Sequence, residues 1–190
     1  GSEMRALFTV PKDKVLVGAD LSGLELRCLA HYMGDDKYTQ EILTGDIHTA
    51  NQKSAGLDTR DKAKTFIYAF LYGAGDIKIG NIAGGGALEG KTLKANFLNN
   101  TPALRTLRER VSKASDKGYL KALDGRKVRV KSEHASLNFL LQSAGAIIAK
   151  RAWVIFHEIA KGFDYKQLGV IHDEIQIECR PEDAEEIGRL

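Results

Sequence analysis

The chain has 190 residues, of which 43% are hydrophobic and 28% are charged. This composition excludes wholesale disorder, and a chain of this length can bury a core without disulfides or structural metals. With 28 lysines and arginines against 25 aspartates and glutamates, the net charge is +3, which permits a nucleic-acid partner without requiring one.

The sequence also argues against a membrane protein and against a fold stabilised by disulfides. No apolar run approaches the roughly 18 residues of a membrane span, so no membrane partner is expected. Cys28 and Cys179 lie far apart and form no C-x-x-C pair, so a reducing, cytoplasmic location fits best. The chain opens with Gly1-Ser2 and stops inside a helical pattern, so we expect an excerpt of a longer protein.

Apolar runs and turn residues predict three strand regions. Residues 13–20 form a short apolar run, 119–130 carries an Asp-Gly turn between β-prone flanks, and 167–180 forms two strands meeting at His-Asp-Glu. The glycine-rich segment 80–90 is expected to be a loop at the tip of a lobe. Helical spacing and capping residues predict helices at about 22–33, 37–43, 46–55, 60–73, 91–99, 102–116, 133–161 and 181–190. This order predicts an α+β fold rather than an alternating βαβ series.

Two aspartates end predicted strands. Asp20 follows its strand directly, and Asp173 lies at the bend of the last hairpin. Each alone is most simply a structural turn residue. If the two strands are neighbours, however, the carboxylates converge as the hard oxygen ligands that suit Mg²⁺.

Two basic and two phenolic side chains recur at every fourth residue of one predicted helix: Arg60, Lys64, Tyr68 and Tyr72. Each step of four residues drifts only about 40°, so all four share a stripe about 120° wide. Such a stripe suits a nucleoside triphosphate, because the cations can bind its phosphates and the aromatic rings can pack against its sugar and base. An ordinary amphipathic helix with a solvated basic turn has the same spacing, so the pattern alone leaves both interpretations open.

Residues 85–92 also match the G-x-x-x-x-G-K-T pattern of P-loop NTPases. The context argues against that function, because the preceding segment is short, polar and broken by glycine. No series of βαβ crossovers is predicted either. A P-loop NTPase is retained only as an alternative.

Three segments, in this order, resemble motifs A, B and C of family A DNA polymerases: DLSGLELR (20–27), RDKAKTFIYAFLYGAG (60–75) and HDE (172–174). Three others resemble the phage replicative branch of that family, the type found in T-odd coliphages: GDIHTANQ (45–52), LDGRKV (123–128) and LNFLLQSAGA (137–146). The resemblance extends over essentially every residue, and the R-x-x-x-K-x-x-x-Y-x-x-x-Y spacing is highly specific.

The resemblance implies a partial right-hand polymerase fold of the α+β class. Residues 1–34 and 132–190 would form a truncated palm, with a small antiparallel sheet and a long helix, and 35–131 would form mostly helical fingers. The thumb, the exonuclease domain and the last palm strands would be missing, so the chain alone is expected to polymerise weakly or not at all.

The same resemblance implies template-directed DNA synthesis by a two-Mg²⁺ mechanism in DNA replication. Asp20, Asp173 and the backbone carbonyl of Leu21 would hold the two ions. Arg60, Lys64 and His48 would bind the triphosphate of the incoming dNTP, and Lys64 would also donate a proton to the leaving pyrophosphate.

Further residues would recognise the sugar and the DNA. Tyr68 would pack on the incoming nucleotide, and Glu25, held by Tyr72, would exclude ribonucleotides. A tyrosine at the Tyr68 position also implies weak discrimination against dideoxynucleotides. The side chains expected to contact primer–template DNA are Gln142, His172 and Arg126.

Two further expectations concern partners. A processivity factor would bind through the missing thumb. The remaining alternative to a polymerase is a non-catalytic DNA-binding module with the same shape.

Overall fold

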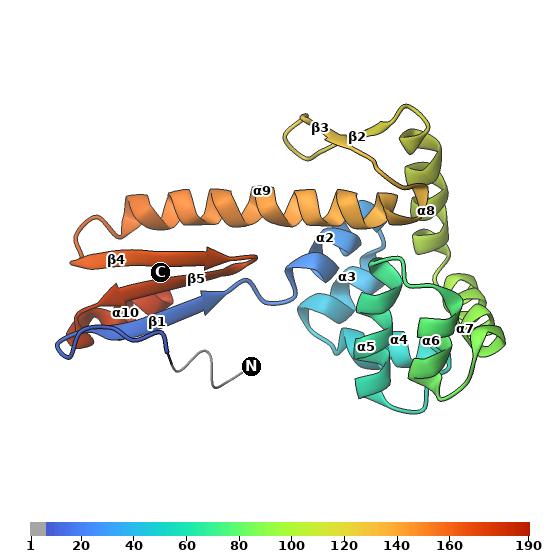
Figure 1. Cartoon of the computed structure of the whole chain (residues 1–190), viewed down its shortest axis with the longest axis horizontal. Coiled ribbons are helices and arrows are strands. Elements are labelled where there is room, and N and C mark those ends of the chain that lie inside the picture. Colours follow the sequence, from blue (N-terminus) through green and yellow to red (C-terminus); the bar gives the residue numbers. More distant parts are fainter. Residues whose placement is uncertain (1–6) are drawn as a thin grey trace. The chain divides into compact units, whose positions relative to one another are not determined.

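The computed structural model describes residues 7–190, which form two compact units (Figure 1). The sheet unit comprises the residues up to Leu24 together with Gly145–Leu190, and the helical unit comprises Glu25–Ala144. Helix α9 (Ser136–Ile159) contributes its first turns to the helical unit and the remainder to the sheet unit. The division into 1–34, 35–131 and 132–190 stays a prediction, and its first six residues lie outside the described range.

The sheet unit is built on three antiparallel strands. β5 (Glu174–Cys179) lies between β1 (Val15–Asp20) and β4 (Tyr165–Ile171). The register places Val15 opposite Cys179 and Asp20 opposite Glu174. The predicted strand at 13–20 and the predicted hairpin at 167–180 are therefore confirmed.

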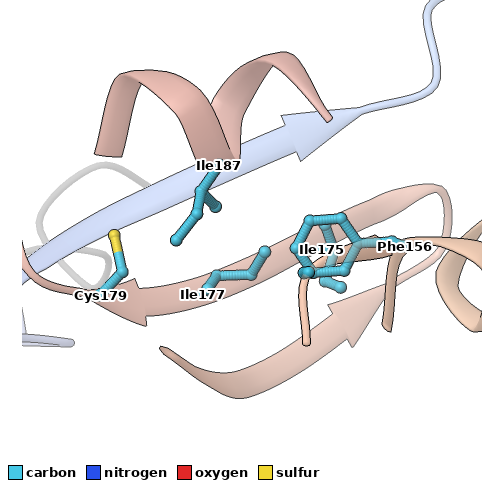
Figure 2. Packing of buried hydrophobic residues seen from close by; sticks show 6 residues of the cluster. Phe156, Ile175, Ile177, Cys179 and Ile187 are labelled. Carbon is cyan, nitrogen blue, oxygen red and sulfur yellow. The ribbon is translucent and has the colours of Figure 1, made fainter. Parts of the chain in front are cut away.

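One face of this sheet carries the core of the unit. Ile175, Ile177 and Cys179 alternate along β5 and are almost completely buried, as expected for side chains that share one face of a strand. Figure 2 shows Ile187 of α10 (Ala184–Arg189) directed toward this row, and Phe156 of α9 beside Ile175. Helix α10 follows a short 3₁₀ turn, Pro181–Asp183. The covered face fixes the strand register, because a slip of one residue would expose every core side chain.

The helical unit contains seven helices besides the start of α9, and a small hairpin, within the described residues. The helices are α2 (Leu24–Met33), α3 (Asp36–Leu43), α4 (Ile47–Ala55), α5 (Arg60–Leu71), α6 (Asp76–Ala83), α7 (Ala87–Asn100) and α8 (Pro102–Ser115). The hairpin pairs β2 (Tyr119–Lys121) with β3 (Lys127–Arg129), and a 3₁₀ turn, Glu133–Ala135, precedes α9. The core includes Phe66 and Phe70 of α5, whose rings meet Phe97 of α7 edge-on at 5.1 and 5.4 Å between centroids.

The glycine-rich segment 80–90 is not a loop, and that prediction is wrong. It contains the end of α6 and the start of α7, joined by a short turn. A Cβ at Gly80 would lie 1.8 Å from the carbonyl oxygen of Gly86, and a Cβ at Gly90 would lie 1.9 Å from that of Asp76. The glycines are therefore required by the close approach of two helix backbones.

This geometry also overturns the P-loop alternative. A phosphate-binding P-loop connects a buried strand to a helix, whereas here α6 precedes the turn. Lys91, the residue that would reach the phosphates, is an exposed residue within α7. Of the two motif glycines, Gly90 is required by the close approach of α7 to α6, whereas a Cβ at Gly85 would meet only the Glu89 side chain.

Helix α9 also corrects the expectation about membrane spans. Among the described residues it is one helix that is long and apolar enough to cross a membrane, judged by length and composition alone. Leu141, Ala144 and Phe156 of this helix are buried, whereas Val154, Ile155 and Ile159 are about half exposed. Core helices of other proteins can pass the same test.

Candidate active site

The first group of candidate residues lies at one end of the sheet unit. Asp20 is the last residue of β1, and Asp173 lies in the two-residue turn between β4 and β5. The backbone N–H of Leu21 donates to the carbonyl oxygen of Asp173 over 3.1 Å, which extends the β1–β5 pairing past the end of the strand. The prediction that Asp20 and Asp173 lie next to each other is confirmed.

The environment of Asp20 is strongly acidic. Desolvation, the charges of Asp173 and Glu174, and a hydrogen bond with the Asp173 carboxyl all raise the pKa of Asp20. Every one of these contributions disfavours the ionised form, and the charges of Asp173 and Glu174 make the site locally acidic. Glu174 is in turn hydrogen-bonded by the side-chain amide of Gln176 on the same strand.

These residues fit a divalent cation bound partly by substrate. The described residues contain no cluster of three or more His, Cys, Asp or Glu side chains placed to hold a metal ion. Two carboxylates are, however, what Mg²⁺ commonly takes from a protein when substrate phosphates and water complete its shell. The carbonyl oxygen of Leu21 accepts one hydrogen bond, from Leu24 N–H at 3.2 Å, and a carbonyl oxygen retains a second lone pair.

The turn that carries Asp173 has an unusual backbone. His172 has φ of 58°, and it is the one residue besides glycine with positive φ among the described residues. A side chain in this left-handed region costs about 1–2 kcal/mol, and histidine tolerates it better than most residues. The turn thus presents an exposed imidazole directly beside the acidic pair.

The second group of candidate residues lies on α5 in the helical unit. Thr59 caps this helix by accepting a hydrogen bond from the N–H of Lys62. The stripe of basic and phenolic residues lies outside the core, because Phe66, Ile67 and Phe70 point to the buried side. The rings of Tyr68 and Tyr72 follow each other at 6.5 Å.

His48 joins the same surface from the first turn of α4. Its ring lies 6.3 Å from that of Tyr68. Burial, followed by the nearby charges of Arg60 and Lys64, lowers the pKa of His48, although Asp46 opposes this effect. Its Nδ1 atom is buried and has no hydrogen-bond partner in the structure. His48 thus adds an imidazole to the surface that carries Arg60 and Lys64.

Glu25 and Tyr72 are hydrogen-bonded, as the resemblance to family A polymerases implies. The phenolic hydroxyl of Tyr72 lies 2.8 Å from both carboxylate oxygens of Glu25 and donates to them. The bond joins α2 to the end of α5, 47 residues along the chain. It holds the Glu25 carboxylate beside the tyrosine end of the stripe.

The remaining predicted DNA contacts are distributed over both units. Gln142 is exposed on α9 within the helical unit, whereas His172 belongs to the sheet unit. Arg126 lies in the β2–β3 hairpin, where its Nε donates to Asp124 over 2.6 Å. Likewise, the α5 stripe belongs to the helical unit and the acidic pair to the sheet unit.

Sequence reasoning missed one participant, Asp46. Asp46 is the N-cap of α4, where its side chain accepts from the N–H of His48. Its carboxylate also binds Arg60, with 2.6 Å between Nε and Oδ2 and 3.2 Å between Nη2 and Oδ1. A separation of fourteen residues across two helices has no periodic signature, so no spacing rule could have found this pair.

Comparison with known proteins gives a consistent result. The model for DNA polymerase family A matches residues 1–190. The DNA-directed DNA polymerase of Enterobacteria phage T3 is 50% identical over 199 residues, covering 90% of this chain and 28% of that protein. The corresponding enzyme of Escherichia phage T7 is 49% identical over 203 residues, covering 93% and 29%. The chain therefore spans less than a third of the length of these relatives.

A solved structure shows the same fold. The POL domain of Pol1 from M. smegmatis, in complex with DNA primer-template and dNTP, matches with a TM-score of 0.82 at 23% identity. The match covers 96% of this chain and 36% of that one. The predicted partial polymerase fold of the α+β class is confirmed.

Proposed function

The chain belongs to DNA polymerase family A, and we propose that it supplies the nucleotide-binding and metal-binding residues for template-directed DNA synthesis in replication. In the proposed reaction, a primer 3′-hydroxyl attacks the α-phosphate of a dNTP paired with the template, and pyrophosphate leaves. Such a reaction depends mainly on positioning and on stabilisation of charge. The two groups of residues described above serve these two needs.

Asp20, Asp173 and the Leu21 carbonyl would hold two Mg²⁺ ions. When bound, the ions assist the attacking oxygen and stabilise the leaving one. Desolvation and the neighbouring charges of Asp173 and Glu174 raise the pKa of Asp20. The neighbouring charges support this proposal, because a divalent cation neutralises carboxylates that lie close together. Glu174 adds to the negative charge and has a lesser role.

On α5, Arg60 and Lys64 would bind the triphosphate together with His48. Lys64 would donate a proton to the departing pyrophosphate. Tyr68 would pack against the incoming nucleotide, and its hydroxyl would compensate for a missing 3′-hydroxyl, so we expect weak discrimination against dideoxynucleotides. If Tyr68→Phe leaves that discrimination unchanged, this role of Tyr68 is wrong.

Glu25 would occupy the space of a ribose 2′-hydroxyl and thereby exclude ribonucleotides. Gln142 and His172 would probe the minor groove at the primer end, where all correct pairs present an acceptor. Arg126 would contact the DNA backbone. A processivity factor would bind outside this chain, and the two buried free cysteines support work in a reducing cytoplasm.

The observation that carries the proposal is the pairing of Asp20 with Asp173 at the end of β1 and β5. We expect Asp20→Ala and Asp173→Ala to reduce primer extension by about a thousandfold or more, equivalent to about 4 kcal/mol of transition-state stabilisation. The measurement is single-nucleotide primer extension by a full-length protein that contains this chain. Binding of primer–template DNA, measured in parallel, should be retained.

Asp164→Asn is the matched control, because Asp164 is an exposed carboxylate in the same unit that pairs with Lys14. It should leave extension unchanged. If the wild-type protein binds primer–template but extends nothing with Mg²⁺ and dNTPs present, the non-catalytic alternative is correct. If Asp20→Ala extends primers at the wild-type rate, the proposed metal site is refuted.

A further inference from the structure

The Asp46 carboxylate accepts hydrogen bonds from residues of both α4 and α5. Its Oδ1 accepts from the backbone N–H of His48 over 3.1 Å, and its Oδ2 accepts from the Thr49 hydroxyl over 2.8 Å. Both oxygens also accept from Arg60. One side chain therefore orders the first turn of α4, which carries His48, and the first residue of α5.

We propose that Asp46 is a positioning residue that orients Arg60 for the triphosphate of the incoming nucleotide. This inference rests on the proposed function of the α5 stripe. The bonds from Asp46 engage Nε and one N–H of Nη2, and a guanidinium has five N–H donors. Three donors, including both on Nη1, are left for phosphate oxygens. Asp46 thus fixes the plane of the guanidinium without using up its donors.

The ion pair between Arg60 and Asp46 contributes little to the stability of the fold. The side chains of Arg60 and Asp46 are 50% and 41% exposed, and ion pairs this exposed to solvent contribute little to stability. The two-bond geometry, in contrast, fixes direction, because an arginine side chain is otherwise free to adopt many rotamers. An arginine held in advance loses less entropy when the nucleotide binds.

The experiment must separate this role from helix capping. Asparagine caps helices about as well as aspartate, so Asp46→Asn keeps the cap on α4 but removes the charge and one acceptor that Arg60 uses. In single-nucleotide incorporation by a full-length protein that contains this chain, we expect Asp46→Asn to raise the dNTP concentration for half-maximal rate by up to about fivefold. The maximal rate should stay within about twofold of wild type, because the pair contributes to binding and not to the chemical step.

Two further variants complete the test. Arg60→Ala should raise the half-maximal dNTP concentration more than Asp46→Asn does, and the double variant should equal Arg60→Ala, because Asp46 acts through Arg60. Thr49→Val is the matched control. It removes one hydrogen bond to Asp46 and leaves the Arg60 pair intact, so it should behave as wild type.

The outcomes distinguish this inference from the proposed function. If Arg60→Ala leaves the half-maximal dNTP concentration unchanged, the proposed role of the α5 stripe fails. If Arg60→Ala changes it and Asp46→Asn does not, the positioning role of Asp46 is overturned. A lower value for Asp46→Asn would show that Asp46 sequesters Arg60, and an effect of Asp46→Asn that persists in the Arg60→Ala background would show a structural role. Either result overturns the proposal.

Discussion

The helix pair α6–α7 allows a prediction in which two known effects have opposite signs. In an isolated helix, replacing an interior glycine with alanine stabilises the helix by about 1 kcal/mol. In this structure, a Cβ on Gly80 or Gly90 would lie 1.8 or 1.9 Å from a carbonyl oxygen of the facing backbone. Gly80→Ala and Gly90→Ala therefore measure which effect is larger.

The steric cost of the added Cβ is expected to exceed the gain in helix propensity. Real Cβ atoms essentially never come closer than 3.0 Å to such a neighbour, so the helices would have to separate by about 1 Å at the crossing. Both colliding groups belong to the backbone and cannot rotate away. Overpacking of this kind costs about 3 kcal/mol. After the gain in helix propensity, each variant should lose about 2 kcal/mol of local stability.

Amide hydrogen exchange of the segments that contain α6 and α7 tests this value. A loss of about 2 kcal/mol corresponds to exchange about 30-fold faster in these segments. Gly75→Ser is the control, because nothing lies within 4 Å of a Cβ at Gly75, which is the N-cap of α6. Serine is favoured at that position, so protection should be kept or slightly increased. If Gly80→Ala and Gly90→Ala exchange as slowly as wild type, the close approach of the helices is wrong.

Three further predictions concern the candidate site and its surroundings. Tyr72→Phe removes the hydrogen bond that holds Glu25, so the ratio of ribonucleotide to deoxynucleotide incorporation should rise about fivefold, given about 1 kcal/mol for a partly exposed hydrogen bond. His172→Gly relieves the positive φ of 58° and should slow hydrogen exchange in β4 and β5 about fivefold, corresponding to about 1 kcal/mol, whereas His172→Ala should bring no such gain. Burial, together with the charge of Glu25, raises the pKa of the Cys28 thiol to about 11. Because little thiolate is then present at pH 8, iodoacetamide should modify Cys28 quickly only after unfolding. Rapid modification of the folded protein would contradict this burial.

The α5 stripe shows which features a sequence reveals best. A period of 3.6 residues is a local property, so the shared face of Arg60, Lys64, Tyr68 and Tyr72 follows from spacing alone. The structure agrees, since the intervening aromatic side chains are buried. The adjacency of Asp20 and Asp173 is not local. Spacing left it conditional on the pairing of two strands, and the resemblance to motifs A and C is what predicted it.

The glycines of α6 and α7 show the opposite case. Glycine is the commonest residue of turns, so composition predicts a loop at 80–90. The property that decides the outcome is the distance between two backbones, which depends on how α6 and α7 cross. Local composition contains no record of that distance. The same holds for Asp46 and Arg60, whose pairing depends on how α4 and α5 pack.

The features that break local rules are concentrated at the ends of β1, β4 and β5. Asp20 carries a raised pKa among other acids, and His172 has a backbone conformation that costs energy. A turn selected only for stability would place glycine at position 172 and would separate the carboxylates. Such costs persist where the surrounding structure enforces them, and they are frequent at functional sites. In this hairpin the enforcement comes from the β5 core, because Ile175 and Ile177 fix the register that holds Asp173 beside Asp20. The apolar face of β5 therefore helps to hold the acidic turn in place. Substitutions that weaken the packing of Ile175 or Ile177 should also disturb the position of Asp173 relative to Asp20.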